Sequence, residues 1–203
     1  MTVEEREKSI YEVGETLLAE QLSKNIIAIA TTLQNAPEAC CGNFLEAMQD
    51  LLKQAAKAQK QGNQGPLQYI CISYLQSSLY TGSYLLRIDA YDERQFGDLT
   101  DTYVYWSPDF IFQHLASDIA HFRKHIGESV LRAQEPEIMC FVRQYSLHYY
   151  RIVQQFLTDF IIPIVQAAGV AAEEDFVITF GGYMDEAIAI VDGEEFDHEI
   201  FPH

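Results

Sequence analysis

Sequence patterns typical of catalytic sites are absent from this chain of 203 residues. It has no G-x-S-x-G elbow, no G-x-x-x-x-G-K-[ST] or G-x-G-x-x-G phosphate-binding loop, no H-E-x-x-H zinc motif and no EF-hand loop. Gly181 and Gly182 lie between two strand-like segments, which favours a hairpin turn over a phosphate-binding loop. We therefore expect no cofactor, and we favour a non-catalytic protein over an enzyme.

Cysteine is scarce and unpaired in sequence. The four cysteines are Cys40, Cys41, Cys71 and Cys140, and none belongs to a C-x-x-C pair. This excludes a zinc knuckle and a thioredoxin-type motif. We expect free thiols in a reducing compartment, most of them buried as small hydrophobic side chains.

Long apolar runs are also missing. The longest, "FIIPIVQAAGVAA", is too short to span a bilayer and contains Pro163. The acidic start "MTVEEREKSI" does not resemble a signal peptide, and the chain has no N-x-[ST] glycosylation site. These features predict a cytoplasmic protein.

Basic side chains are few. Thirteen Lys and Arg against thirty Asp and Glu give a formal net charge of −17. Such a chain repels nucleic-acid backbones and anionic membrane surfaces, so neither is an expected partner. A basic protein or a cation is a better candidate, and the plain alternative is that the acidic excess only keeps the protein soluble.

Apolar residues at steps of three and four predict four long helices, over about 4–34, 38–61, 108–132 and 137–167. Pro163 is expected to kink or end the last of them. Residues 67–79 fit a helical face, although their Ile and Tyr content suits a strand nearly as well. We predict a helix there.

An alternating pattern predicts a strand near 84–91, with a short partner strand near 102–106 and a closing hairpin of strands near 176–181 and 186–192. The resulting fold class is α+β and predominantly helical: an antiparallel bundle of about four to five helices with a small antiparallel β-sheet. No linker divides the chain, so we expect one globular domain over 1–203, with a frayed N-terminus at 1–5 and a loose acidic tail at 193–203.

One helix contains a possible metal site. His114, Asp118, His121 and His125 are four, three and four residues apart, so they form a stripe beside the apolar face of helix 108–132. His114 and His125 are about 16 Å apart along the axis, so all four cannot bind one ion. His121 and His125 form the best pair, and the other ligands must come from another helix. A solvated helix edge is the favoured interpretation, and a pH-sensitive surface is a third one.

Acidic residues also gather in two strand regions. They are Asp89, Asp92, Glu93 and Asp98 in one region, and Asp185, Glu186, Asp192, Glu194 and Glu195 in the other. If the two regions pair, acid accumulates at one end of the sheet, where it could bind Mg²⁺, Ca²⁺ or a basic partner. Ordinary solvated strand faces and turns explain these residues more simply.

Net acidity, Tyr-rich segments and the missing motifs together favour a soluble, acidic, intracellular binding or regulatory protein with a basic protein partner. The alternative is a metal-dependent helical-bundle enzyme, or a metal-binding protein, that uses part of the stripe formed by His114, Asp118, His121 and His125 and a divalent ion.

Overall fold

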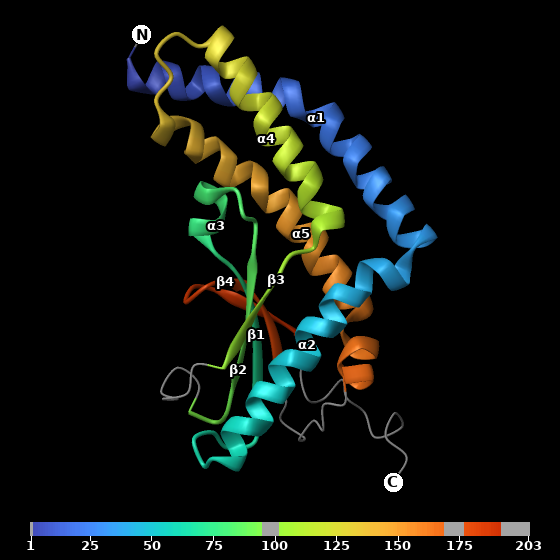
Figure 1. The fold of residues 1–203 in the computed structure, drawn as a ribbon. Coiled ribbons are helices and arrows are strands. Elements are labelled where there is room, and N and C mark those ends of the chain that lie inside the picture. The colour runs from blue at the N-terminus through green and yellow to red at the C-terminus, as the bar shows by residue number, and fades with distance from the viewer. Residues whose placement is uncertain (1, 95–101, 169–176, 192–203) are drawn as a thin grey trace. The chain divides into compact units, whose positions relative to one another are not determined.

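A computed structural model describes residues 2–94, 102–168 and 177–191 of the chain (Figure 1). The chain divides into two compact units. Unit 1 consists of residues 1–40 and 108–153, and unit 2 consists of residues 41–107 and 154–203. The acidic tail predicted at 193–203 lies outside the described residues.

Three helices form unit 1: α1 (Val3–Asn35), α4 (Asp109–Ser129) and the first part of α5 (Glu135–Ala168). α1 begins with a capping box, in which Thr2 accepts from the Glu5 backbone and Glu5 accepts from the Thr2 backbone. Pro108 precedes α4, where a missing backbone donor does no harm. Whether residues 1–5 fray stays a prediction.

The predicted apolar face of α4 is confirmed by the structure. Its buried residues include Ile111, Leu115, Ile119, Phe122 and Ile126. Phe122 is completely buried and its ring centroid lies 4.4 Å from that of Phe141 on α5. The core of unit 1 therefore forms where the apolar stripes of its helices meet.

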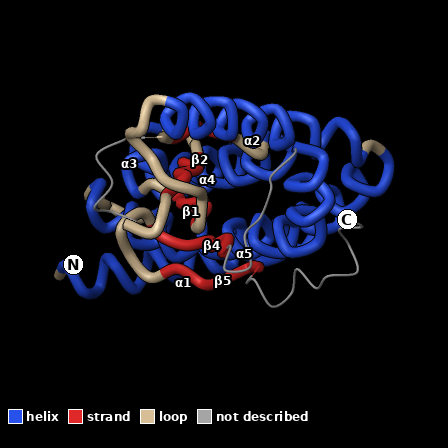
Figure 2. The backbone as a smooth tube through the Cα atoms, turned by 90° about the horizontal axis from the view of Figure 1, so that it is seen from below, coloured by secondary structure: helices blue, strands red, loops and turns tan. Residues whose placement is uncertain are grey.

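Unit 2 contains most of α2 (Pro37–Lys60), the short α3 (Gln76–Thr81), the last part of α5 and a five-stranded sheet. The strands are β1 (Tyr69–Tyr74), β2 (Leu86–Tyr91), β3 (Tyr103–Trp106), β4 (Val177–Gly182) and β5 (Ala187–Val191), in the spatial order β3-β2-β1-β4-β5. β4 and β5 form the predicted hairpin and lie side by side (Figure 2).

One face of the sheet is apolar and packs against helices. Trp106 of β3 lies on this face, and its ring contacts Phe44 of α2 and Phe156 of α5, with centroids 4.4 and 6.0 Å away. Ile72 and Ile88, which pair across β1 and β2 on the same face, are completely buried. The alternation of buried and polar residues along the strands thus sets which side meets the helices.

The helix predicted over 67–79 is wrong. Residues 69–74 form β1, the central strand of the sheet, and a helix starts only at Gln76. Ile70 and Ile72 are buried while Cys71 faces the other side, which is the period of a strand. The apolar residues of β1 and α3 together have the spacing of one helical face. Strand pairing decides that β1 is a strand, and one of its partners, β4, is distant in sequence.

The predominantly helical α+β class is confirmed. The sheet is mixed rather than purely antiparallel, because β1 and β4 pair in parallel. α5 continues past Pro163 to Ala168, so this proline does not end the helix. Among the described residues, no helix has both the length and the apolar character that crossing a membrane requires.

Candidate functional site

α1 and the first part of α5 run parallel to one another. Arg6 near the start of α1 bonds to Glu137 near the start of α5, with Nη2 and Oε1 2.6 Å apart. Further along both helices, Asn25 donates to the hydroxyl of Tyr149 at 2.9 Å. The residue numbers therefore rise together on the two helices.

α4 runs in the opposite direction to α5. Phe122 of α4 contacts Phe141 of α5, whereas the earlier residue Phe112 contacts the later residue Tyr150, with ring centroids 6.0 Å apart. Unit 1 thus consists of two parallel helices and one antiparallel helix packed against both.

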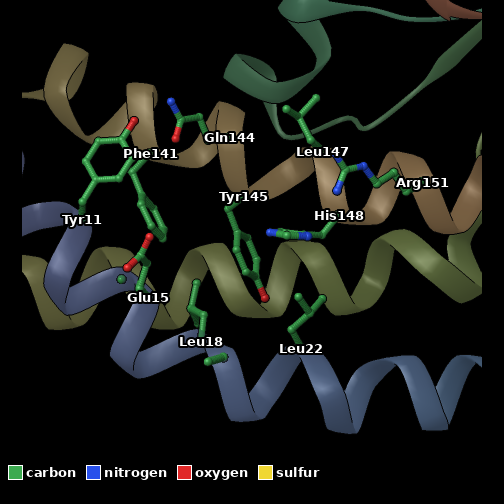
Figure 3. Close-up of a pocket in the computed structure, with 12 residues that line it drawn as sticks. Tyr11, Glu15, Leu18, Leu22, Phe141, Gln144, Tyr145, Leu147, His148 and Arg151 are labelled. Carbon is green, nitrogen blue, oxygen red and sulfur yellow. The ribbon is translucent and has the colours of Figure 1, made fainter.

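A groove of about 680 Å³ lies between α1 and α5 (Figure 3). Each helix contributes a row of residues, most of them one or three positions after the previous one, as one helix face supplies. The rows are Tyr11, Gly14, Glu15, Leu18, Ala19 and Leu22 from α1, and Phe141, Gln144, Tyr145, Leu147, His148 and Arg151 from α5. Most of this lining is apolar or aromatic.

Close packing at Gly14 closes the bottom of the groove at one end. A Cβ atom added to Gly14 would lie 2.2 Å from Cζ of Phe141, so only glycine lets this ring approach the backbone of α1. Leu18 is buried beside it. Phe141 and Leu18 therefore form a firm apolar floor.

Polar side chains mark the rim. Glu15, Gln144, His148 and Arg151 are exposed. In Figure 3, Glu15 lies near Tyr11 at one end, and Arg151 lies at the other. Neither Glu15 nor Arg151 has an ion pair or hydrogen bond with any residue in the described ranges, so both charges remain available to a bound group.

Behind the groove wall, a buried polar cluster joins all three helices of unit 1. Asp118 of α4 is 2% exposed, and its Oδ2 accepts hydrogen bonds from the hydroxyls of Tyr145 and Tyr149, each at 2.5 Å. Asn25 of α1 donates to both carboxyl oxygens, at 3.1 and 3.0 Å. Gln21 in turn donates to Asn25 at 3.0 Å. We call Asn25, Asp118, Tyr145 and Tyr149 the polar clamp.

The two tyrosines of the polar clamp remain neutral donors. Burial, and secondly the hydrogen bonds to Asp118, raise the pKa of Tyr145 well above its ordinary value of 10.0. The same two causes, in the same order, raise the pKa of Tyr149. No Lys or Arg within the described part of the chain pairs with Asp118, so neutral groups alone satisfy this carboxylate.

Tyr145 connects the polar clamp to the groove. Its ring lines the groove, and its hydroxyl bonds to Asp118 on α4. The ring of His148 meets that of Tyr145 edge-on, with centroids 5.9 Å apart. The groove wall on α5 is therefore fixed in position by a hydrogen bond to α4.

The four residues of the predicted stripe on α4 lie in different environments. Asp118 is buried, so its predicted position at the helix edge is wrong: it lies between Leu115 and Phe122 on the inward face. His114 is half-buried, while His121 and His125 are exposed, with ring centroids 6.5 Å apart. Asp118 is committed to the polar clamp and does not reach these histidines through any described contact.

No group of three or more His, Cys, Asp or Glu residues in the described ranges is arranged to hold a metal ion. His125 does line a smaller pocket of about 330 Å³ with Glu12, Val13, Thr16 and Leu17 of α1. Metal binding by His121 and His125, or by His114 and Asp118, stays a prediction.

The acidic strand regions do not gather at one end of the sheet. β2 and β5 share the sheet but are separated by β1 and β4. Asp92 follows the end of β2 that pairs with the start of β1, whereas Asp185 and Glu186 follow the opposite end of β4. Asp98, Asp192, Glu194 and Glu195 lie outside the described residues.

Asp89 and Asp92 are buried and bonded to arginines. The distances are 2.7 Å from Arg87 to Asp89 and 2.5 Å from Arg94 to Asp92. The side-chain bond from Arg94, together with the backbone N–H of Gly65, holds the pKa of Asp92 at about 2 despite its burial. These carboxylates serve the fold of unit 2.

Sequence analysis did not identify the groove or the polar clamp. One signal was present: Asn25 continues the buried stripe that contains Leu18 and Ile29, and a polar residue on such a stripe indicates a buried polar contact. Comparisons with models of protein families, with curated proteins and with solved structures found no match to this chain.

Proposed function

We propose that the protein is a non-catalytic, cytoplasmic binding protein that takes an amphipathic helix of a basic partner protein into the groove between α1 and α5. The observation that carries this proposal is the pair of lining rows. Both have helical spacing and run parallel, and their apolar or aromatic members recur at intervals of three and four residues on α1 and are Phe141, Tyr145 and Leu147 on α5. A groove of this form suits a helix that presents residues i, i+3, i+4 and i+7.

The polar clamp supports the same function. A groove can select a partner only if its walls hold a fixed separation, because loosely placed walls lose affinity when they are ordered on binding. Asn25 of α1 and Tyr145 and Tyr149 of α5 all bond to Asp118 of α4. These bonds fix the positions of the two groove walls before a partner binds.

The charge distribution favours a basic partner and disfavours nucleic acid. Unit 2 has eighteen acidic against five basic residues, and unit 1 has twelve against eight. Such a field accelerates the approach of a cationic protein, and salt weakens this attraction. The groove then provides the specific contacts.

A pull-down with a matched pair of variants tests the proposal. Ala19→Trp places a large ring in the groove from an exposed position, and Ala120→Trp makes the same change at an exposed position of α4 that lines no described pocket. We expect a basic protein to be captured by the native chain and by Ala120→Trp, to be lost with Ala19→Trp, and to bind less at higher salt. Equal capture by all three proteins would contradict the groove.

A further inference from the structure

The groove has a direction, because its two unpaired charges lie at opposite ends. Glu15 lies beside Phe141, near the end where α1 and α5 begin, and Arg151 lies at the other end (Figure 3). From residue 141 to residue 151 a helix rises about 15 Å, so the two charges are separated by roughly three turns. A bound helix of ordinary length can reach both.

α4 shows how a helix packs on these two neighbours. It lies antiparallel to α5, and Asp118 at its middle contacts both α1 and α5. An antiparallel helix places its own dipole favourably against the two parallel dipoles of α1 and α5. A fourth helix with the same direction as α4 would therefore suit the groove.

Resting on the proposed function, we infer that the occupant is a helix antiparallel to α1 and α5, with an Asp or Glu near its start, beside Arg151, and a Lys or Arg about ten residues later, beside Glu15. Apolar residues at steps of three and four fill the interval. This order also suits the bound helix itself, since acidic side chains are favourable in its first turn and basic ones in its last.

Three independent features agree on this arrangement. Glu15 and Arg151 have no partner among the described residues, so each gains a first ion pair on binding. The small, exposed side chain of Ala19 leaves room between the rows, where a larger residue would fill the space. Leu22 and Leu147, beside the buried Leu18, supply the apolar contact between the charged ends.

Selection from a phage-displayed library of amphipathic helical peptides, with the charged positions randomised, provides the test. The full chain is the bait, and bound peptides are then measured against Ala19→Trp, Ala120→Trp and the charge-swapped Glu15→Arg/Arg151→Glu. Leu147→Asp serves as a second groove variant, and circular dichroism confirms that each variant is folded.

We expect enriched peptides to have an acidic residue about ten positions before a basic one, and to lose at least about tenfold in affinity on Ala19→Trp, Leu147→Asp and the charge swap. Selection against the charge-swapped chain should return the reversed order. Peptides that depend on the groove but show no charge order, or the reverse order, overturn this inference and leave the proposed function standing. Peptides that bind Ala19→Trp as tightly as the native chain, or a failure to select any, overturn both.

Discussion

Buried carboxylates are satisfied in different ways in the two units. In unit 1, Asp118 of α4 accepts from two tyrosine hydroxyls of α5 and from an asparagine amide of α1. In unit 2, Asp89 and Asp92 each pair with an arginine two residues away along the chain. The first arrangement fixes helices against one another, whereas the second stabilises β2 and the turn that follows it, with Asp92 also accepting from the Gly65 backbone.

The Arg–Asp pairs and the polar clamp therefore have different structural roles. Each Arg–Asp pair joins residues i and i+2, so the pair itself requires no contact between distant segments. The polar clamp forms only when α1, α4 and α5 have one particular register, because its members are up to 124 residues apart. We infer that the polar clamp selects the register that shapes the groove.

The largest effect is expected from removing the centre of the polar clamp. Asp118→Ala removes the acceptor of two buried hydroxyls and leaves the Asn25 amide with the Tyr149 hydroxyl alone, and should lower the free energy of unfolding by about 3 to 5 kcal/mol. Denaturant unfolding measures this. The control is Asp50→Ala, which removes an exposed partner of Lys53 and should change stability by less than about 1 kcal/mol. Equal effects of the two variants would mean that the polar clamp does not organise unit 1.

Tyr145→Phe tests one bond of the polar clamp without removing its carboxylate. Loss of a hydroxyl donor to Asp118 should lower the free energy of unfolding by about 1.5 to 3 kcal/mol at neutral pH. Because the tyrosine hydroxyl lies behind the groove wall, peptide affinity for the groove should fall as well. Phe160→Leu, at a residue of unit 2, is the control and should leave peptide affinity for the groove unchanged.

The raised pKa of Tyr145 also predicts a dependence on alkaline pH. The folded pKa lies above the unfolded value of 10.0, so stability is fully present below pH 10 and is lost as pH rises from there towards the folded pKa. Each tyrosine held neutral contributes a slope of about 1.4 kcal/mol per pH unit. Between pH 9 and about 11, the free energy of unfolding should fall less steeply with pH in Tyr145→Phe than in the native chain. Parallel curves would contradict a raised pKa at Tyr145.

The pairing of Asp92 with an arginine predicts a loss of stability at acidic pH. The pKa of Asp92 is lowered from 3.8 to about 2, so its stabilisation is present above pH 3.8 and is lost as pH falls towards 2. Since Arg94 is 46% exposed, screening reduces the contribution to about 1 to 2 kcal/mol. Arg94→Gln should remove most of this acid dependence, and an unchanged acid profile would count against it. Lys53→Gln, at an exposed pair, should leave the profile as it is.

The smallest effect is expected at the exposed histidines. Replacing His121 and His125 together by Gln should change the free energy of unfolding by less than about 1 kcal/mol, because both side chains face solvent. Phe122→Ala, between them on the buried face, should cost about 3 to 5 kcal/mol. Thermal melts of the two variants compare them directly. Similar losses, or a stabilisation by Zn²⁺ that the double variant lacks, would favour the metal-binding alternative.

Sequence periodicity predicted the long helices, because each has one continuous apolar stripe. It also predicted β2, in which apolar and polar residues alternate, and the β4–β5 hairpin, whose strand-like segments lie on either side of Gly181 and Gly182. It failed at β1, since a central strand is identified by its neighbours, and those neighbours include the distant β4. It failed again at Asp118, because the partners that make burial favourable lie on other helices.

The groove lay beyond sequence reasoning for a related reason. Periodicity shows which face of a helix is apolar, but not whether another helix of the same chain covers all of it. Leu147 illustrates this: it belongs to an apolar-rich segment of α5, yet it is 43% exposed and lines the groove. Only the packing of three helices shows that this part of the face remains open.

Photo-crosslinking from inside the groove tests the central claim most directly. A benzophenone amino acid is placed at Leu147 in one protein and at Ala120 of α4 in another, and both are irradiated in a lysate of the native host. We predict that position 147 crosslinks to one basic protein, that the crosslink maps to a single amphipathic helix, and that Ala19→Trp abolishes it while position 120 gives no such product. Equal crosslinks from both positions, or a product at 147 that contains only a small molecule, would contradict a groove that binds a partner's helix.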